Sequence, residues 1–397
     1  MNKKLGLAVA GALLAASTTA SAGITIPAGD WTVDLGGNVN AFYTNTQVDT
    51  SVRGGAKTSS PDANTIGTGL LPAALGIGAK SRQNDLDIAF QFTFFTGTSS
   101  GDSVLSGGAA GNNTLNIRQA FLTVGDASWG TVKFGRDLGI YGSDAILSDM
   151  TLLGVGTGGP AGGSSTLGRI GSGYIYADWK GQISYTSPNW NGFQVSAGVM
   201  ENFNPSTAGT VATSANTNNS NMDWEAKATY DFAANDVTGR VWVSGITQKT
   251  ESTAANGSYT SRGFDIGGKV AYQGAQLVGY YYDGEGLDSQ NSLLQGLFNG
   301  NGVKSKDSGG YVQGTFVVPG IGTKLGASWG VSNSKSPTAG AFDIENQSWI
   351  VGAYHPLTKS LNLVAEYTAQ EKKWNNTSST NTKVESDTFS LGAIMFF

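Results

Sequence analysis

The chain ends in the stretch 387–397, which reads DTFSLGAIMFF. Every second position is apolar, so one face of an extended strand carries Phe389, Leu391, Ala393, Met395 and Phe397. An edge strand of a soluble sheet that ended this way would bury its terminal carboxylate or expose aromatic rings to water. A strand with one face in lipid, ending at the membrane interface, meets neither difficulty. The stretch therefore favours a membrane β-strand over a soluble edge strand.

The opposite end of the chain has the features of a secretory signal peptide. Residues 1–22 begin with Lys3 and Lys4, continue with an apolar run and end in the small residues Ala20, Ser21 and Ala22. The apolar run is too short to span a membrane as a helix. We expect cleavage near Ala22, which leaves a single domain over 23–397 in an exported protein.

The composition is that of a β-barrel in a membrane. Charged residues make up 13% of the chain, well below the roughly 25% of a soluble domain. No later segment is apolar for long enough to form a membrane helix. The remaining way to satisfy every backbone group in lipid is a closed barrel with alternating apolar and polar side chains. The net charge of −5 argues against nucleic acid as a partner.

Alternation of this kind recurs along the whole chain. Near 85–95, for example, Phe90 and Phe92 share one face while Gln91 and Thr93 share the other. If the apolar face meets lipid, the polar face lines an aqueous lumen. The charged residues in lumen phase are then Asp34, Asp87, Glu225, Lys227, Arg240, Asp265, Lys269, Lys324 and Glu366.

Short and long connections take turns along the chain. Short ones carry turn residues, as in Gln273-Gly274, and long ones are rich in Gly, Ser, Asn and Thr. The long stretches lie near 47–69, 97–112, 139–172, 202–221, 250–259, 285–305, 334–345 and 373–384. Eight long loops and seven short turns predict an all-β fold, a sixteen-stranded antiparallel transmembrane barrel. Sixteen strands leave an aqueous channel rather than a packed interior.

The segment VKFGR (132–136), followed by the long stretch 139–172, resembles the general diffusion porins of Gram-negative bacteria. The resemblance covers the mature chain, including the terminal Phe397, which in such proteins is read by the barrel-assembly machinery. It implies a homotrimer in outer-membrane lipid. It also implies that the third long loop, 140–173, folds into the lumen and narrows it.

Within that loop the residues suggest which side chains form the constriction. Ser143 would cap a short helical turn with Asp144 near its positive end, while Ser148 and Asp149 would face water beside it. Arg118 sits one strand before the VKFGR segment, where the family has a lumen arginine. If Ile117 and Phe121 point outward, Arg118 points inward. The predicted constriction residues are therefore Asp144, Ser148, Asp149 and Arg118.

The predicted function is passive diffusion of small hydrophilic solutes and ions, filtered by size and charge at the third loop. Acids in lumen phase and in the loop outnumber the bases, which predicts a weak cation preference. The alternative is a channel specific for a sugar, a phosphate or a small organic anion. Tyr280 and Tyr282 share the lumen face with Gln276 and would form its stacking track, unless they support a loop or belong to the aromatic girdle.

One catalytic pattern, GASWG (326–330), matches the nucleophile elbow of hydrolases, and Asp343 and His355 follow in the right order. That elbow requires a turn from a strand into a helix, whereas here the alternation continues straight through Ser328. With 58 glycines in the chain such a match arises by chance. A single His and no Cys leave no other catalytic or metal-binding constellation. We therefore expect no enzyme activity, no cofactor and no metal.

Overall fold

In the computed structural model, strands and connections are described for 23–98, 115–158, 165–201, 217–218, 221–252, 258–287, 304–335, 342–376 and 381–397. The predicted signal peptide, 1–22, lies outside the described residues. Among the residues that are described, no helix is long and apolar enough to span a membrane.

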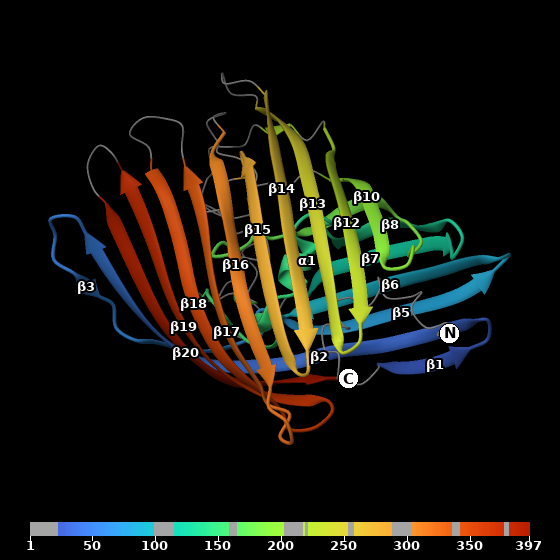
Figure 1. The fold of residues 1–397 in the computed structure, drawn as a ribbon, viewed down its shortest axis with the longest axis horizontal. Helices are drawn as coiled ribbons and strands as arrows, with labels where there is room; N and C mark the ends of the chain where they lie inside the picture. Colours follow the sequence, from blue (N-terminus) through green and yellow to red (C-terminus); the bar gives the residue numbers. More distant parts are fainter. Residues whose placement is uncertain are drawn as a thin grey trace.

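Sixteen of the described strands form one closed antiparallel ring, which confirms the predicted fold class (Figure 1). Each pairs with the next one along the chain. They are β2 (Trp31–Val52), β5 (Ala73–Gln83), β6 (Leu86–Thr96), β7 (Asn116–Asp126), β8 (Gly130–Leu138), β9 (Trp179–Thr186), β10 (Phe193–Met200), β12 (Asp223–Ala234), β13 (Val237–Ser252), β14 (Ser258–Tyr272), β15 (Ala275–Glu285), β16 (Lys306–Val317), β17 (Lys324–Lys335), β18 (Phe342–Pro356), β19 (Leu361–Asn376) and β20 (Thr382–Phe396).

The ring closes where the first of these strands meets the last. The register between β2 and β20 runs from Asn38 opposite Phe396 to Val52 opposite Thr382. The amide and carbonyl of Phe397 then both hydrogen-bond to Gly37, at 3.1 and 2.9 Å. The terminal phenylalanine is therefore tied to the first barrel strand and is not frayed.

Four shorter strands extend this ring. β1 (Ile24–Ala28) pairs with the first residues of β2, which precede the part of β2 that pairs with β20. β3 (Thr58–Ser59) and β4 (Ala63–Gly67) pair with the part of β2 from Phe42 to Thr50. β11 (Thr217–Asn218) pairs with the end of β13. These pieces lengthen the walls without changing the order of the ring.

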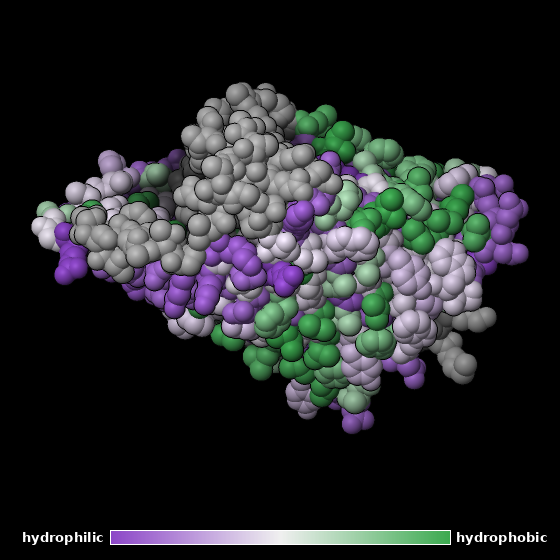
Figure 2. Space-filling model, turned by 90° about the horizontal axis from the view of Figure 1, so that it is seen from above, coloured by the Kyte–Doolittle hydropathy of each residue, from purple (hydrophilic) through white to green (hydrophobic). Residues whose placement is uncertain are grey.

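The strand faces separate as the alternation predicts. In β20, Phe389, Leu391 and Met395 are exposed, whereas Ser390 and Ile394 are 1% exposed. Figure 2 shows hydrophobic residues gathered in patches on the surface of the molecule. A surface of exposed Leu, Phe, Val and Tyr side chains suits lipid, and aqueous solvent would make it costly.

The short turns depend on residues that tolerate a left-handed backbone. Asn84 and Asp85 join β5 to β6 with φ of 48° and 63°, and Gln273 and Gly274 join β14 to β15 with φ of 45° and 85°. Two-residue turns of this type match the twist of antiparallel strands, and they favour Asn, Asp and Gly. The Asn84-Asp85 turn is one that the sequence analysis did not single out.

A β-bulge interrupts the alternation between β6 and β7. The register shifts after Thr93, which pairs with Gln119, because Phe94 pairs with Ile117 and leaves Arg118 as the extra residue. Arg118 and Gln119 are both buried, and Phe121 is 5% exposed. The expectation that Phe121 points outward is therefore wrong, because the bulge reverses the parity of the strand beyond Arg118.

The lipid-facing surface can be tested at one position. We expect Leu391→Arg to destabilise the folded barrel by about 2–4 kcal/mol, because it places a cation in the middle of the apolar band. The matched control is Gln47→Arg on the neighbouring strand β2, an exposed position farther along toward the long loops, where the cost is about 0–1 kcal/mol. The measurement is the urea dependence of the folded fraction in detergent or lipid. Equal costs at the two positions would contradict this assignment of the apolar band.

Candidate channel constriction

The connection from β8 to β9 is hydrogen-bonded to side chains of several wall strands. Its described parts are 139–158 and 165–178, and they contain a helical turn, α1 (Ser143–Leu147), and a 3-10 turn, η1 (Met150–Leu153). Ala145, Ile146, Met150, Leu152 and Val155 are buried in one apolar cluster, together with side chains from the inner face of the wall. We call 139–178 the constriction segment.

Wall carboxylates accept hydrogen bonds from the first amides of this segment. Glu225 of β12 accepts from the backbone nitrogens of Ile140 at 2.5 Å and Tyr141 at 2.8 Å. Asp265 of β14 accepts from the backbone nitrogen of Gly142 at 3.1 Å. Gly142 adopts a φ of 72°, which glycine accommodates without strain. The chain therefore reaches α1 with its free amides satisfied by the wall.

Asp144 of α1 is held by two wall cations. Its carboxylate lies 2.6 Å from the Lys227 ammonium of β12 and 3.1 Å from the Arg240 guanidinium of β13. Burial alone would raise the pKa of Asp144, but the two cations outweigh it and keep this pKa below its usual value. Arg240 is also paired with Asp231, at 2.6 Å.

A third wall carboxylate holds the segment after η1. Glu366 of β19 accepts from the backbone nitrogens of Val155 and Gly156, both at 2.8 Å, and from the Tyr354 hydroxyl at 2.6 Å. Glu366 is 2% exposed, so these three donors replace the water that the carboxylate loses.

The remaining acid predicted at the constriction, Asp149, organises the segment itself. One of its oxygens accepts from the Thr151 nitrogen at 2.9 Å and caps η1. The other accepts from the Arg169 nitrogen at 3.2 Å and from the Tyr174 hydroxyl at 2.8 Å. The structure differs from the expectation here, because Asp144, Asp149 and Ser148 are 4, 3 and 9% exposed and do not face open water.

Four other predicted residues lie in two kinds of surroundings: two cations lie beside aromatic rings, and two acids lie near the ends of their strands. Arg118 is buried beside the Phe95 ring, 4.9 Å from its centroid, and Lys324 lies 4.7 Å from the Tyr354 centroid. Asp34 and Asp87 lie near the short-turn ends of their strands, where Asp34 pairs with Lys80 at 3.0 Å and Asp87 with Arg82 at 2.9 Å. Neither of these two acids has a hydrogen bond to the described parts of the constriction segment.

Lys269 of β14 is the remaining cation among the predicted lumen-lining residues. It lies directly opposite Arg240 in the register of β13 and β14. Among the described residues no carboxylate forms a salt bridge with its ammonium. Its side chain is partly exposed. Lys227, Arg240 and Lys269 thus form a basic row on three adjacent strands beside α1.

The tyrosines considered as a stacking track pack beneath the constriction segment. Tyr280 and Tyr282 are 6 and 0% exposed, and the Tyr280 hydroxyl donates to Asp265 at 3.2 Å. The Tyr311 ring meets the Tyr174 ring edge-on and the Tyr280 ring at a tilt, and its hydroxyl donates to the Ala145 carbonyl at 2.8 Å. These positions match the loop-support reading of the two residues.

The sequence analysis missed the buried cations. Lys180 of β9 pairs with Asp223 at 2.8 Å and with Glu225 at 2.5 Å, and all three side chains are at most 5% exposed. The weak alternation around 178–187 hid the inward phase of Lys180. Arg169, which is 0% exposed, lies in a loop where no periodicity indicates burial.

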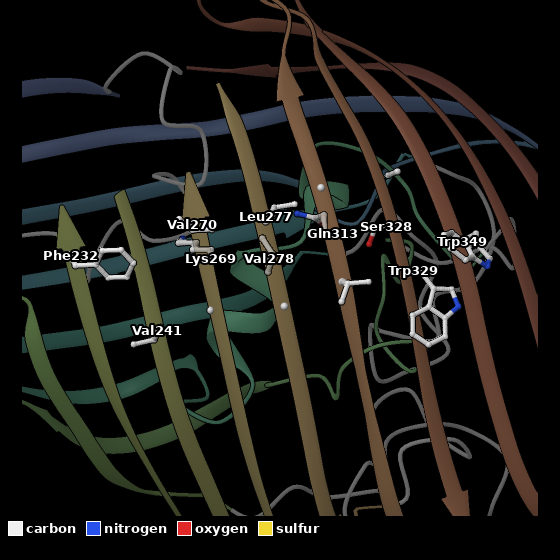
Figure 3. A pocket seen from close by; sticks show the side chains of 15 residues that line it. Phe232, Val241, Lys269, Val270, Leu277, Val278, Gln313, Ser328, Trp329 and Trp349 are labelled. Atoms are coloured by element: carbon white, nitrogen blue, oxygen red, sulfur yellow. The ribbon is translucent and has the colours of Figure 1, made fainter. Parts of the chain in front are cut away.

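An apolar hollow of about 670 Å³ is lined by residues of β12–β18, with Lys269 and Ser328 among them (Figure 3). Its lining includes Leu277, Val312 and Trp349, which are 63, 56 and 59% exposed and belong to the outer face.

In the described part of the chain, no group of three His, Asp or Glu side chains is placed to hold a metal ion.

The Glu366 contacts generate a prediction for the constriction segment. Glu366→Ala leaves three buried donors without an acceptor, at a cost of about 1–3 kcal/mol each. We expect faster proteolysis within 139–178 and a lower unfolding midpoint, measured on the purified protein in detergent. Glu366→Gln keeps one carbonyl acceptor and should give a smaller effect. Proteolysis of both variants at the wild-type rate would contradict the role given to Glu366.

The Asp144 contacts generate a pH dependence. Because the folded pKa of Asp144 lies below its unfolded value of about 3.9, its stabilisation is complete above that pH and disappears as the pH falls through the folded pKa. The stability difference between the wild type and Asp144→Asn should therefore be constant near neutral pH and shrink below about pH 4. The measurement is the unfolding midpoint of both proteins across this range. A difference that grew on acidification would contradict the ion-pair assignment.

Comparison with known proteins gives the same fold. The chain aligns with the outer membrane channel DcaP of Acinetobacter baumannii at 16% identity and a TM-score of 0.65, over 95% of this chain and 100% of that one. It aligns with OmpT of Vibrio cholerae at 16% identity and a TM-score of 0.53, over 94% of this chain and 100% of that one. It aligns with Salmonella typhi OmpF, solved with daunomycin, at 14% identity and a TM-score of 0.52, over 92% of this chain and 100% of that one.

No curated protein sequence matches the chain. The model of the Gram-negative porin family, however, matches residues 6–375, which is nearly the whole length. The chain therefore belongs to the Gram-negative porin family, whose members are outer-membrane channels.

Proposed function

We propose that the protein is a passive diffusion channel for small hydrophilic solutes and ions across the outer membrane, with the constriction segment folded into the lumen. The observation that carries this is the attachment of 139–178 to inward-facing side chains of strands as far apart as β12 and β19. A segment held on that face narrows the aqueous path by its own volume. Solutes too large for the narrowed path would then be excluded, and the positive charges of the basic row would act on ions that pass it.

We further propose that 1–22 is removed as a signal peptide, that 23–397 is the mature barrel and that three copies assemble in the membrane. The family membership supports export and an outer-membrane location. The terminal Phe397 remains the residue through which we expect the barrel-assembly machinery to act. A planar-bilayer recording tests the assembly, because a trimer gives open steps in groups of three.

The weak cation preference remains a prediction, and its basis changes. Glu225, Asp265 and Glu366 are at most 2% exposed, with their carboxylates hydrogen-bonded to the constriction segment. These acids are used for holding the segment and are shielded from a passing ion. Any cation preference therefore depends on the net charge, which changes from −5 to −7 when Lys3 and Lys4 leave with residues 1–22, and on rim acids such as Asp34 and Asp87.

Lys269 offers the sharpest test of the charge filter. Its ammonium forms no salt bridge among the described residues, so Lys269→Ala removes a positive charge without breaking an ion pair. We expect the reversal potential in a KCl gradient to move toward the cation side, with little change in conductance. Lys80→Ala, at a cation paired with Asp34 near the strand end, is the control and should shift it less. An unchanged reversal potential in Lys269→Ala would place this residue off the ion path.

The second candidate is a channel specific for a small anion. The neighbouring positions of Arg240 and Lys269 favour it, because two adjacent cations suit a carboxylate or a phosphate. Current block by inorganic phosphate or a small dicarboxylate that saturates, and that weakens in Lys269→Ala, would support the specific channel. Block that rises linearly with concentration would support general diffusion.

A further inference from the structure

The GASWG pattern has a role other than catalysis. The segment 326–330 lies within β17, where its odd and even positions face opposite sides of the wall. The Trp329 ring lies at a tilt against that of the exposed Trp349 on the outer side, with centroids 6.2 Å apart, whereas Ser328 is 2% exposed (Figure 3). The inward positions are Gly326, Ser328 and Gly330, and we call them the Gly-Ser-Gly strip.

Both glycines of the strip are places where the constriction segment touches the wall backbone. A Cβ added at Gly330 would lie 2.5 Å from the Ser172 carbonyl oxygen and 2.8 Å from an Arg169 guanidinium nitrogen. A Cβ added at Gly326 would lie 2.5 Å from the Met150 sulfur. Real Cβ atoms do not approach other atoms this closely. A larger residue at Gly330 would meet backbone and displace the segment, whereas at Gly326 the flexible Met150 side chain would have to move.

Between the two glycines, Ser328 receives the buried Arg169 side chain. The Arg169 Nε donates to Ser328 Oγ at 2.5 Å, and Nη1 donates to Ser348 Oγ of β18 at 3.0 Å. No carboxylate is hydrogen-bonded to this guanidinium in the described structure, and Nη2 has no partner there. A buried cation held only by neutral groups costs stability, so its retention suggests a positioning role.

The neighbouring residues extend the same attachment. Ser348 Oγ donates to Ser172 Oγ at 3.0 Å, the Gly173 nitrogen donates to Ser332 Oγ at 3.1 Å, and Asn346 donates to the Gly171 carbonyl at 2.7 Å. The part of the segment after Gly168 is therefore joined to β17 and β18 by uncharged wall side chains. The part before it is held by wall carboxylates and by the Asp144 ion pairs.

We propose that the Gly-Ser-Gly strip and Arg169 are the seat that fixes the second half of the constriction segment and so sets the width of the channel. This inference rests on the proposed function. Arg169 acts through the position of the segment, which makes it a positioning residue. If the seat is released, this half of the segment moves while the ion-paired half stays attached. If the seat is filled, the segment is pushed toward the lumen.

Two opposite perturbations test the seat by single-channel recording in KCl. Arg169→Ala should replace the steady open level by fluctuating levels and should admit larger neutral polyethylene glycols. Gly330→Ala should lower the open conductance. The control, Gly279→Ala, lies on β15, two strands from β17 in the ring, where an added Cβ meets nothing within 4 Å, and it should behave as wild type. Heat-modifiable gel mobility establishes for each variant that the barrel is folded.

A reversible lock separates position from general stability. The chain has no cysteine, so Ser172→Cys with Ser348→Cys introduces the only thiols, at side chains whose Oγ atoms lie 3.0 Å apart. In the Arg169→Ala background, oxidation should restore one steady level in the same channel, and dithiothreitol should abolish it again. If Arg169→Ala only damaged the fold, the conductance would not change reversibly as the disulfide forms and is reduced.

Wild-type conductance and size exclusion in both Arg169→Ala and Gly330→Ala would overturn the seat, as would failure of the thiols to pair in a folded barrel. If Arg169→Ala does not fold, Gly330→Ala and the lock in the wild-type background still decide. A wild-type protein that forms no channel would refute the proposed function. A conducting wild type with indifferent variants would refute only the seat.

Discussion

The pairing of β2 with β20 is the constraint on which the rest of the structure depends. A sheet in lipid has no water to satisfy its edges, so the first and last barrel strands must meet in register along their shared length. Once they do, one face of every strand belongs to lipid and the other encloses a space. The enclosed space can then hold polar groups that the outer face cannot carry.

Inside that space, charge is used in two ways. Glu225, Asp265 and Glu366 accept backbone amides of the constriction segment, so they replace solvent for a buried piece of chain. Arg240 and Lys269, in contrast, are only partly buried. The distinction is physical, because a carboxylate enclosed by donors is largely compensated, whereas an accessible ammonium presents its field to the lumen.

Alternation predicted the ring of strands because the period of two is a local property that lipid enforces on each strand. It also predicted the inward phase of Ser328 and Glu366. It could not predict the bulge at Arg118, since one extra residue leaves no compositional mark and reverses the phase that follows. Nor could it tell which inward acids bind the segment, because Glu366 and Val155 are 211 positions apart and only the closed ring brings them together.

That separation affects the order of folding. The wall residues that hold the constriction segment belong to β12, β14, β17, β18 and β19, all of which follow the segment in the chain. Contacts between residues so far apart form slowly, because a long stretch of chain must be ordered first. The attachment of the constriction segment to the wall is therefore expected among the last contacts to form, after the strands that hold it have been paired.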